Sequence, residues 1–306
     1  MKLQTVYRAY GHIPASIRRT VAPVARACRP ILQRAALSSS QKKFWDENGY
    51  LVLPGFFGED VIDTLNLFVD ELWNTRKRRP DLPFMVDFDH GKADQKRWPI
   101  HEVPDWGRQT IYKLNDLYLE CPFVRLMVLN PVMSDMLNVL LDGEPVICNT
   151  LNLEWGSEQD YHFDTFYMAP QKQNKLVASW IALEDISEDA GPLKFVSGSH
   201  KIPPFIFPKS GTTVASHEEM PMVQEYIETE VAKRGLKEEL FLGKKGDCLL
   251  WHAQLLHAGS KHRDRTKTRK SIVTHYWRWD DLPGADVRID RNGTNWLYRH
   301  HQPRIR

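Results

Sequence analysis

The chain has 306 residues, of which 42% are hydrophobic and 26% are charged. This composition is typical of a soluble globular protein, and the length suffices for one large domain or two small ones with an ample core. The formal net charge of +2 argues against nucleic acid as a partner, because such a partner calls for a strongly basic surface.

The cysteines also restrict the class of protein. Cys28, Cys121, Cys148 and Cys248 form no Cys-x-x-Cys pair, which argues against a zinc module. We therefore expect reduced thiols and a cytoplasmic location. No apolar run reaches the roughly 18 residues of a spanning helix, so we expect no transmembrane segment.

The N-terminal segment is basic. Nine Lys or Arg and no Asp or Glu occur between Met1 and Trp45, and we predict that residues 1–40 form an extension outside the folded domain. The segment has no continuous apolar stretch, which argues against a secretory signal. Three interpretations stay open: an interfacial helix in residues 1–37 that contacts anionic lipid, an organelle transit peptide, or a simple tail.

The next part of the chain reads as mostly helical. Residues 41–47 and 59–75 have the composition and apolar spacing of helices, and residues 122–141 are mostly apolar at helical spacing. Residues 78–108 are polar and rich in Asp, Lys and Pro, which is typical of a long loop and suggests a substrate lid. We predict that residues 41–144 form the helical N-terminal part of one domain spanning 41–306.

The second half reads as strands. From about residue 145 to about residue 280, short apolar runs alternate with turn residues, and this density of strands predicts a double-stranded β-helix, the jelly-roll core shared with cupins. Residues 201–240 interrupt the rhythm with a Pro-rich entry and a charged helix, which we interpret as an insertion covering the mouth of a site. The predicted fold is mainly β with flanking helices.

A His-x-Asp motif lies in the aromatic run YHFDTFY. In a strand, His162 and Asp164 would point the same way and reach one metal ion, with Phe163 packing behind them. Two histidines and one aspartate are the ligands with which non-haem Fe(II) oxygenases hold one face of the metal. The motif alone is weak, since a lone histidine in an apolar strand is more often a packed core residue than a ligand. A third ligand must come from a distant segment.

That segment is KKGDCLLWHAQLLHAGSKHRDRTKTRKSIVTHYW. We predict that His257 ends one strand of a hairpin and supplies the third ligand, while Arg269 opens the next strand. His252, five residues before His257, would point to the opposite face, and we interpret it as structural. Arg269 offers a bidentate donor for a carboxylate such as the far end of 2-oxoglutarate, and Ser271 and Val273 would share its face.

The whole pattern resembles the phytanoyl-CoA dioxygenase family of iron- and 2-oxoglutarate-dependent oxygenases. Five segments from about residue 41 to about residue 280 carry the resemblance in order: FWDENGYLVLPGFF, YHFDTFYM, VASWIALEDISEDAGPLKFVSGSHK, GDCLLWHAQLLHAGS and TRKSIVTHYW. It implies that His162, Asp164 and His257 bind Fe(II), with 2-oxoglutarate and O2 as co-substrates. Related halogenases carry a small residue in place of Asp164, so its carboxylate favours hydroxylation.

The resemblance also implies a co-substrate pocket. Its residues would be Arg269 and Ser271, which would pair with the distal carboxylate of 2-oxoglutarate, together with Lys113, Trp180 and Leu151. First candidates for substrate contact are polar and aromatic residues near the motif, although packing explains each about as well: Asn149, Trp155, Asp160, Tyr161, Phe166 and Tyr167.

We therefore predict a dioxygenase that hydroxylates an aliphatic C–H bond of a small-molecule or lipid-linked substrate, glycolipids included, and releases succinate and CO2. Two alternatives stay open: a non-catalytic oxygenase-like binding or scaffold protein, and a cupin-type metal enzyme that does not use 2-oxoglutarate. Peripheral membrane contact through residues 1–37 is one of the open interpretations, and we expect no nucleic acid as a partner. The expected location is the cytoplasm, with targeting to an organelle left open.

Overall fold

The computed structural model describes residues 37–89, 94–168, 175–214 and 218–305. The basic extension predicted over residues 1–40, including the segment proposed to contact lipid, therefore lies outside the described residues except for its last few positions.

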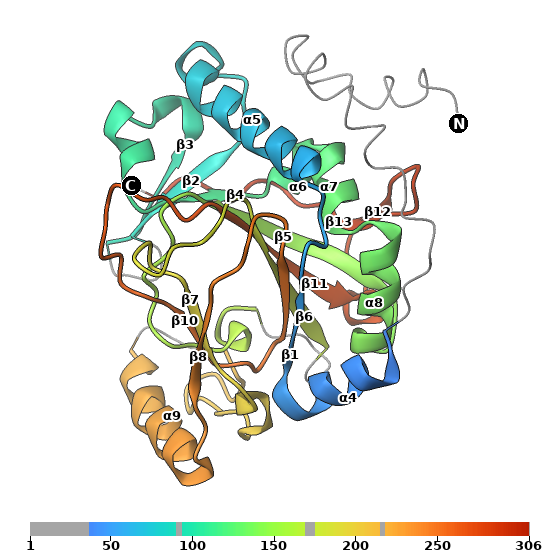
Figure 1. The fold of residues 1–306 in the computed structure, drawn as a ribbon. Coiled ribbons are helices and arrows are strands. Elements are labelled where there is room, and N and C mark those ends of the chain that lie inside the picture. The colour runs from blue at the N-terminus through green and yellow to red at the C-terminus, as the bar shows by residue number, and fades with distance from the viewer. Residues whose placement is uncertain (1–36, 90–93, 169–174, 215–217, 306) are drawn as a thin grey trace.

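Two sheets form the centre of the molecule (Figure 1). The larger one follows the order β1-β9-β6-β11-β5-β4-β2-β3. Outside this order, β13 pairs with both β5 and β12. Its strands are β1 (Tyr50–Leu53), β2 (Met85–Phe88), β3 (Lys96–Pro99), β4 (Lys113–Asn115), β5 (Pro145–Leu153), β6 (Leu176–Ala182), β9 (Cys248–His252), β11 (Ser271–Arg278), β12 (Val287–Ile289) and β13 (Asn295–Leu297). The smaller sheet has the order β10-β7-β8, from β10 (His257–Gly259), β7 (Leu193–Val196) and β8 (Glu238–Phe241).

Helices cover one face of the larger sheet. Figure 1 shows α5, α7 and α8 on the side away from the smaller sheet. The α-helices are α4 (Ser39–Asn48), α5 (Glu59–Thr75), α6 (Leu117–Glu120), α7 (Pro122–Val128), α8 (Pro131–Leu141) and α9 (Met220–Arg234). Short 3-10 turns are η1 (Arg76–Arg78), η2 (Ile100–Glu102), η3 (Asp105–Gln109), η4 (Asp164–Phe166), η5 (Ser199–Lys201) and η6 (Trp279–Asp281).

The two faces of strand β11 serve different layers. Ile272 and Tyr276 pack in the cluster shared with the helices, whereas Val273 packs with Trp180 and Phe195 between the two sheets. This alternation follows from the two-residue period of a strand. A mainly β fold with flanking helices and a double-stranded β-helix core is therefore confirmed. We call the face of the larger sheet that carries Val273, toward the smaller sheet, the inner face.

The N-terminal part differs from its predicted helical character. Residues 78–108, predicted as a lid-like loop, contain β2 and β3, which pair with each other and continue the larger sheet through β4. The helix predicted over 122–141 is two helices, α7 and α8, bent by 56°. The break occurs because Pro131 begins α8, while the Asn130 side chain caps its first turn by accepting from the Met133 amide.

The predicted hairpin around His257 is wrong. His252 ends β9 in the larger sheet, and a turn in which the Leu255 amide donates to the His252 carbonyl leads the chain into β10 of the smaller sheet. Arg269 precedes β11, which returns to the larger sheet between β6 and β5. The chain thus changes sheets twice, a step that local periodicity does not reveal.

The region 201–240 contains α9, which packs through Val223 and Ile227 against Phe163, Phe166 and Phe207. Helix α9 therefore packs against the two phenylalanines that follow His162 in the chain. Within the described ranges, no single helix has the length and hydropathy to cross a membrane; the bent pair of α7 and α8 meets that test only when counted together.

Helix α5 offers a matched test of the core. Leu65 is fully buried and Leu67 is 52% exposed on the same helix. Replacement Leu65→Ala should lower the free energy of unfolding by about 2–5 kcal/mol, because it leaves a cavity between helix and sheet. Leu67→Ala should change it by less than about 0.5 kcal/mol. Chemical denaturation of both variants measures the difference, and equal effects would contradict this packing.

Candidate metal centre and co-substrate pocket

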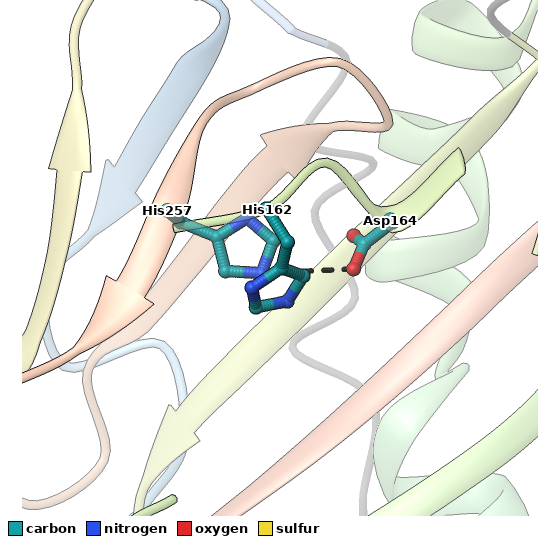
Figure 2. A group of neighbouring side chains, drawn as sticks. All are labelled: His162, Asp164 and His257. Carbon is teal, nitrogen blue, oxygen red and sulfur yellow. Dashed lines mark ion pairs between the residues drawn. The ribbon is translucent and has the colours of Figure 1, made fainter. Parts of the chain in front are cut away.

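Three potential metal ligands meet on the inner face. The side chains of His162, Asp164 and His257 are buried, and their ligand atoms all lie within 4.8 Å of one another. Figure 2 shows the three side chains pointing toward one another. His257 is on β10, whereas His162 and Asp164 belong to the segment between β5 and β6. His162 and His257 come together because their backbones form an antiparallel bridge, with N–H···O distances of 3.0 and 3.1 Å.

The local conformation of the His-x-Asp motif differs from the predicted strand. Phe163 is extended, but Asp164 begins the 3-10 turn η4. The motif therefore bends after one extended residue, and Phe163 is buried in the cluster formed with α9. Both metal-ligating candidates still converge, because the bend brings the Asp164 carboxylate back toward the imidazole of His257, at 3.6 Å.

Each histidine presents its Nε2 atom to the site. His162 Nδ1 lies 2.7 Å from the Asp160 carbonyl, and His257 Nδ1 lies 2.9 Å from the Leu255 carbonyl. A carbonyl only accepts, so Nδ1 carries the proton and Nε2 is free to ligate. Burial lowers the pKa of both imidazoles, that of His162 strongly. Both rings are therefore neutral, the form that binds metal.

The Asp164 carboxylate is held in its ionised form. Burial favours its protonated form, but His275, by its charge and by a hydrogen bond to the carboxylate, outweighs that effect and keeps the pKa of Asp164 below its usual range. Trp251 Nε1 donates to its Oδ2 atom at 2.7 Å, and His275 Nε2 lies 3.3 Å from its Oδ1 atom. Two neutral imidazoles and one carboxylate fit Fe(II), which binds such a set and keeps open positions.

Arg269 is a buried cation that lacks an anionic partner among the described residues. It is 2% exposed, and its Nε and Nη1 atoms make no hydrogen bond there. Its guanidinium lies 5.5 Å from the centre of the Trp180 ring, and burial lowers its pKa to about 10. Gly156 has φ of +77°, and a Cβ atom there would lie 3.1 Å from Arg269 Nε. The absence of a side chain at Gly156 thus leaves space for the Arg269 guanidinium.

Other donors accompany Arg269. The Ser271 Oγ and Trp180 Nε1 atoms are buried and have no hydrogen-bond partner within the described ranges. Buried polar groups are normally bonded, so a cluster of orphaned donors beside a guanidinium indicates a site for an anion. A carboxylate accepts from a guanidinium and a hydroxyl at once, which fits one end of 2-oxoglutarate.

Lys113 and Leu151 line the same inner layer. Lys113 on β4 is buried, its ammonium donates to Gln159 Oε1 at 3.1 Å, and burial lowers its pKa to about 7. Leu151 lies opposite Val273 in the β5–β11 register and packs against the inner cluster that contains Trp180. The residues that the family resemblance implied therefore face one compartment.

The six candidates for substrate contact divide by position. Tyr167 is 44% exposed, and its ring lies 5.5 Å from that of His162. Tyr161 turns away from the site, because its hydroxyl donates to Glu238 and its ring lies under the Lys194 ammonium. Lys194 lies on the outer face of the smaller sheet, because its neighbours in sequence, Leu193 and Phe195, both pack in the cluster between the two sheets.

The other four have contacts that account for their positions. Phe166 is buried against Phe207, and Trp155 donates from Nε1 to the Arg108 carbonyl. The Asp160 side chain is exposed, and only its carbonyl reaches the site, through His162 Nδ1. Asn149 contacts His275 at 2.6 Å.

Sequence reasoning missed His275 and Trp251. Both contact the Asp164 carboxylate, yet neither belongs to a ligand motif. A signal for His275 was present, since it follows Ser271 and Val273 at the same two-residue spacing. Trp251 had no comparable signal, because its role depends on β9 lying beside β6 in the sheet.

Comparisons with known proteins agree with this geometry. The family model for phytanoyl-CoA dioxygenase (PhyH) matches residues 45–271. The peroxisomal phytanoyl-CoA dioxygenase of Rattus norvegicus is 24% identical over 286 residues, covering 87% of this chain and 79% of the rat protein. The Homo sapiens protein of the same name is 24% identical over 80% of this chain and 70% of its own length.

Solved structures share the fold. The non-haem alpha-ketoglutarate-dependent carbocyclase SnoK from nogalamycin biosynthesis has a TM-score of 0.56 at 15% identity, covering 79% of this chain and 84% of its own. EctD from S. alaskensis, solved with 2-oxoglutarate and 5-hydroxyectoine, has a TM-score of 0.56 at 16% identity, covering 82% and 79%.

The match over residues 45–271 spans most of the chain and includes all three candidate ligands and Arg269. The predicted family, enzyme class and cofactors, Fe(II) and 2-oxoglutarate with O2, are confirmed. This chain belongs to the phytanoyl-CoA dioxygenase family and is an Fe(II)- and 2-oxoglutarate-dependent dioxygenase.

Proposed function

We propose that His162, Asp164 and His257 hold Fe(II) and that Arg269 and Ser271 bind the distal carboxylate of 2-oxoglutarate. The observation that carries this proposal is the meeting of three buried ligands with a buried guanidinium that has no anionic partner in the described chain. When bound, Fe(II) supplies the oxidative chemistry, in which 2-oxoglutarate and O2 are converted to succinate and CO2 while the substrate is oxidised.

The protein's own residues position the reactants and exclude water. The backbone carbonyls at Asp160 and Leu255 orient the two imidazoles. Lys113, Trp180 and Leu151 line the pocket for 2-oxoglutarate, and the buried donors there recognise a dianion by charge and shape. Tyr167 is exposed beside His162, and an incoming substrate would meet its ring.

We propose that the substrate is a small or lipid-linked molecule and that the enzyme hydroxylates one of its aliphatic C–H bonds. The carboxylate of Asp164 supports hydroxylation, since it fills the position that a halide would need. The rat and human relatives are named for phytanoyl-CoA, and the basic extension over residues 1–40 suits an amphiphile presented at an anionic surface.

Two other functions are weaker. A scaffold without catalysis has no reason to retain three ligands and an orphaned guanidinium together, because each is costly to bury. A cupin-type metal enzyme without 2-oxoglutarate has no use for Arg269 and Ser271 beside the metal set. Co-substrate dependence separates that alternative directly.

Anaerobic titration with Fe(II) and then 2-oxoglutarate tests the site. Wild-type protein should develop a weak visible charge-transfer band, and His162→Ala should not, because it lacks a ligand. Arg269→Ala should weaken 2-oxoglutarate binding by about 2–5 kcal/mol, the effect of removing one partner of a buried charge pair. His252→Ala, a histidine outside the ligand set, should keep the band. A folded, metal-loaded wild type without the band would favour the two alternatives.

The pKa of Lys113 predicts a pH dependence. Its folded value of about 7 means that the ammonium is charged below pH 7 and neutral above it. A dianion favours the charged form, so binding above pH 7 must take up a proton, and affinity for 2-oxoglutarate should fall by up to about tenfold per pH unit.

The control for this pH dependence is Lys113→Arg, which stays charged and should show a flat profile between about pH 6 and 9. Lys113→Met should bind 2-oxoglutarate more weakly at low pH and also show a flat profile. Calorimetry at several pH values measures all three proteins. A wild-type affinity that is independent of pH would exclude Lys113 from the co-substrate pocket.

Membrane contact is tested by deletion. If residues 1–37 bind anionic lipid, their removal should abolish co-sedimentation with vesicles of anionic phospholipid, because it removes seven of the nine basic residues that precede Asp46. Neutral vesicles are the control. Unchanged sedimentation of the truncated protein would refute the contact, and imaging of both forms in cells would distinguish a cytoplasmic location from an organelle.

A further inference from the structure

Both oxygens of the Asp164 carboxylate have a nitrogen donor nearby. Trp251 Nε1 donates to Oδ2 at 2.7 Å, and His275 Nε2 lies 3.3 Å from Oδ1. All three residues are at most 5% exposed. A carboxylate with two fixed donors cannot rotate freely about its last bond, so its orientation is set before any ligand arrives.

His275 is itself fixed. It lies directly opposite Asn149 in the β5–β11 register, and its Nδ1 atom is 2.6 Å from Asn149 Oδ1. The Asn149 amide nitrogen in turn lies 3.4 Å from Met168 Sδ. The register of β11 shifts immediately after His275, which ends the regular ladder at the residue that reaches Asp164.

A role in packing alone does not account for this arrangement. His275 occupies an inner position beside apolar residues, and a buried imidazole is costly there unless its nitrogens are bonded. Its two nitrogens face oxygens that can only accept, Asn149 Oδ1 and the Asp164 carboxylate, so each nitrogen carries a proton and the ring donates at both ends. An aliphatic side chain would fill the same space at lower cost, so the polar contacts are what the histidine adds.

We infer that His275 is a positioning residue, which holds Asp164 so that a single carboxylate oxygen faces the metal, and that Asn149 sets the orientation of the His275 ring. This inference rests on the proposed metal site. Because an Asp164 carboxylate bound through both oxygens would occupy an extra coordination position, keeping it monodentate preserves the open face that the co-substrates need.

The test compares His275→Leu, which fills the space without a donor, with His275→Gln, which returns an N–H near the position of Nε2. Anaerobic Fe(II) titration gives the metal affinity, and the charge-transfer band with 2-oxoglutarate reports the ligand geometry. His275→Leu should bind Fe(II) about 10–100-fold more weakly than wild type, with a shifted band. His275→Gln should recover most of the affinity and the wild-type band position.

Two further variants complete the experiment. His252→Gln replaces a histidine outside the site and should leave Fe(II) affinity unchanged. Asn149→Leu removes the contact that orients the ring and should weaken Fe(II) binding several-fold; it carries the test should His275→Leu fail to fold. Thermal unfolding of the metal-free proteins separates a loss of stability from a loss of metal affinity.

Wild-type Fe(II) affinity in both His275→Leu and Asn149→Leu would overturn the inference. Equal weakening in His275→Leu and His275→Gln would overturn it as well, because the N–H donor would then be irrelevant. If wild-type protein itself develops no band, the proposed metal site fails, and that result is distinct from a normal wild type with unaffected variants.

Discussion

The antiparallel bridge between His162 and His257 is the interaction on which the site depends. Its two hydrogen bonds join His162, in the segment after β5, to His257, the first residue of β10. Without it, the two imidazoles would belong to unrelated segments, and Asp164 would face only part of a ligand set. The bridge uses backbone groups alone, so it leaves both imidazole rings free for the metal.

The site concentrates groups that do not favour folding. Arg269 and Ser271 bury donors without partners among the described residues, and each such donor costs about 1–3 kcal/mol. Lys113 is buried deeply enough to lower its pKa to about 7. The apolar layers on either side of the larger sheet offset these costs. A charged ligand that satisfies the donors would recover part of the lost stability.

Strand β11 connects the parts of the site. On its inner face Ser271, Val273 and His275 follow one another from the anion-binding end to the Asp164 carboxylate. On its outer face Ile272 and Tyr276 anchor the strand in the helix-covered core. One strand therefore sets the distance between the guanidinium that precedes it and the carboxylate beside its far half. Both neighbouring strands fix its register.

The sequence by itself determined the fold class, the family and the identity of the clustered residues. Local chemistry was sufficient for this, because His-x-Asp, a distant histidine and an arginine before an apolar strand are readable from residue types and order. The two-residue period also placed Ser271 and Val273 on one face. The two-residue period of a strand follows from its own backbone geometry, and tertiary contacts do not alter it.

Only the tertiary structure decided how these segments meet. The chain leaves the larger sheet after His252 and returns at β11, so the predicted hairpin did not form, although both its ends reached the site. Tyr161 and Trp155 turned to partners far along the chain. The contacts of His275 and Trp251 with Asp164 join three separate segments. Such contacts depend on strand order, which local sequence does not encode.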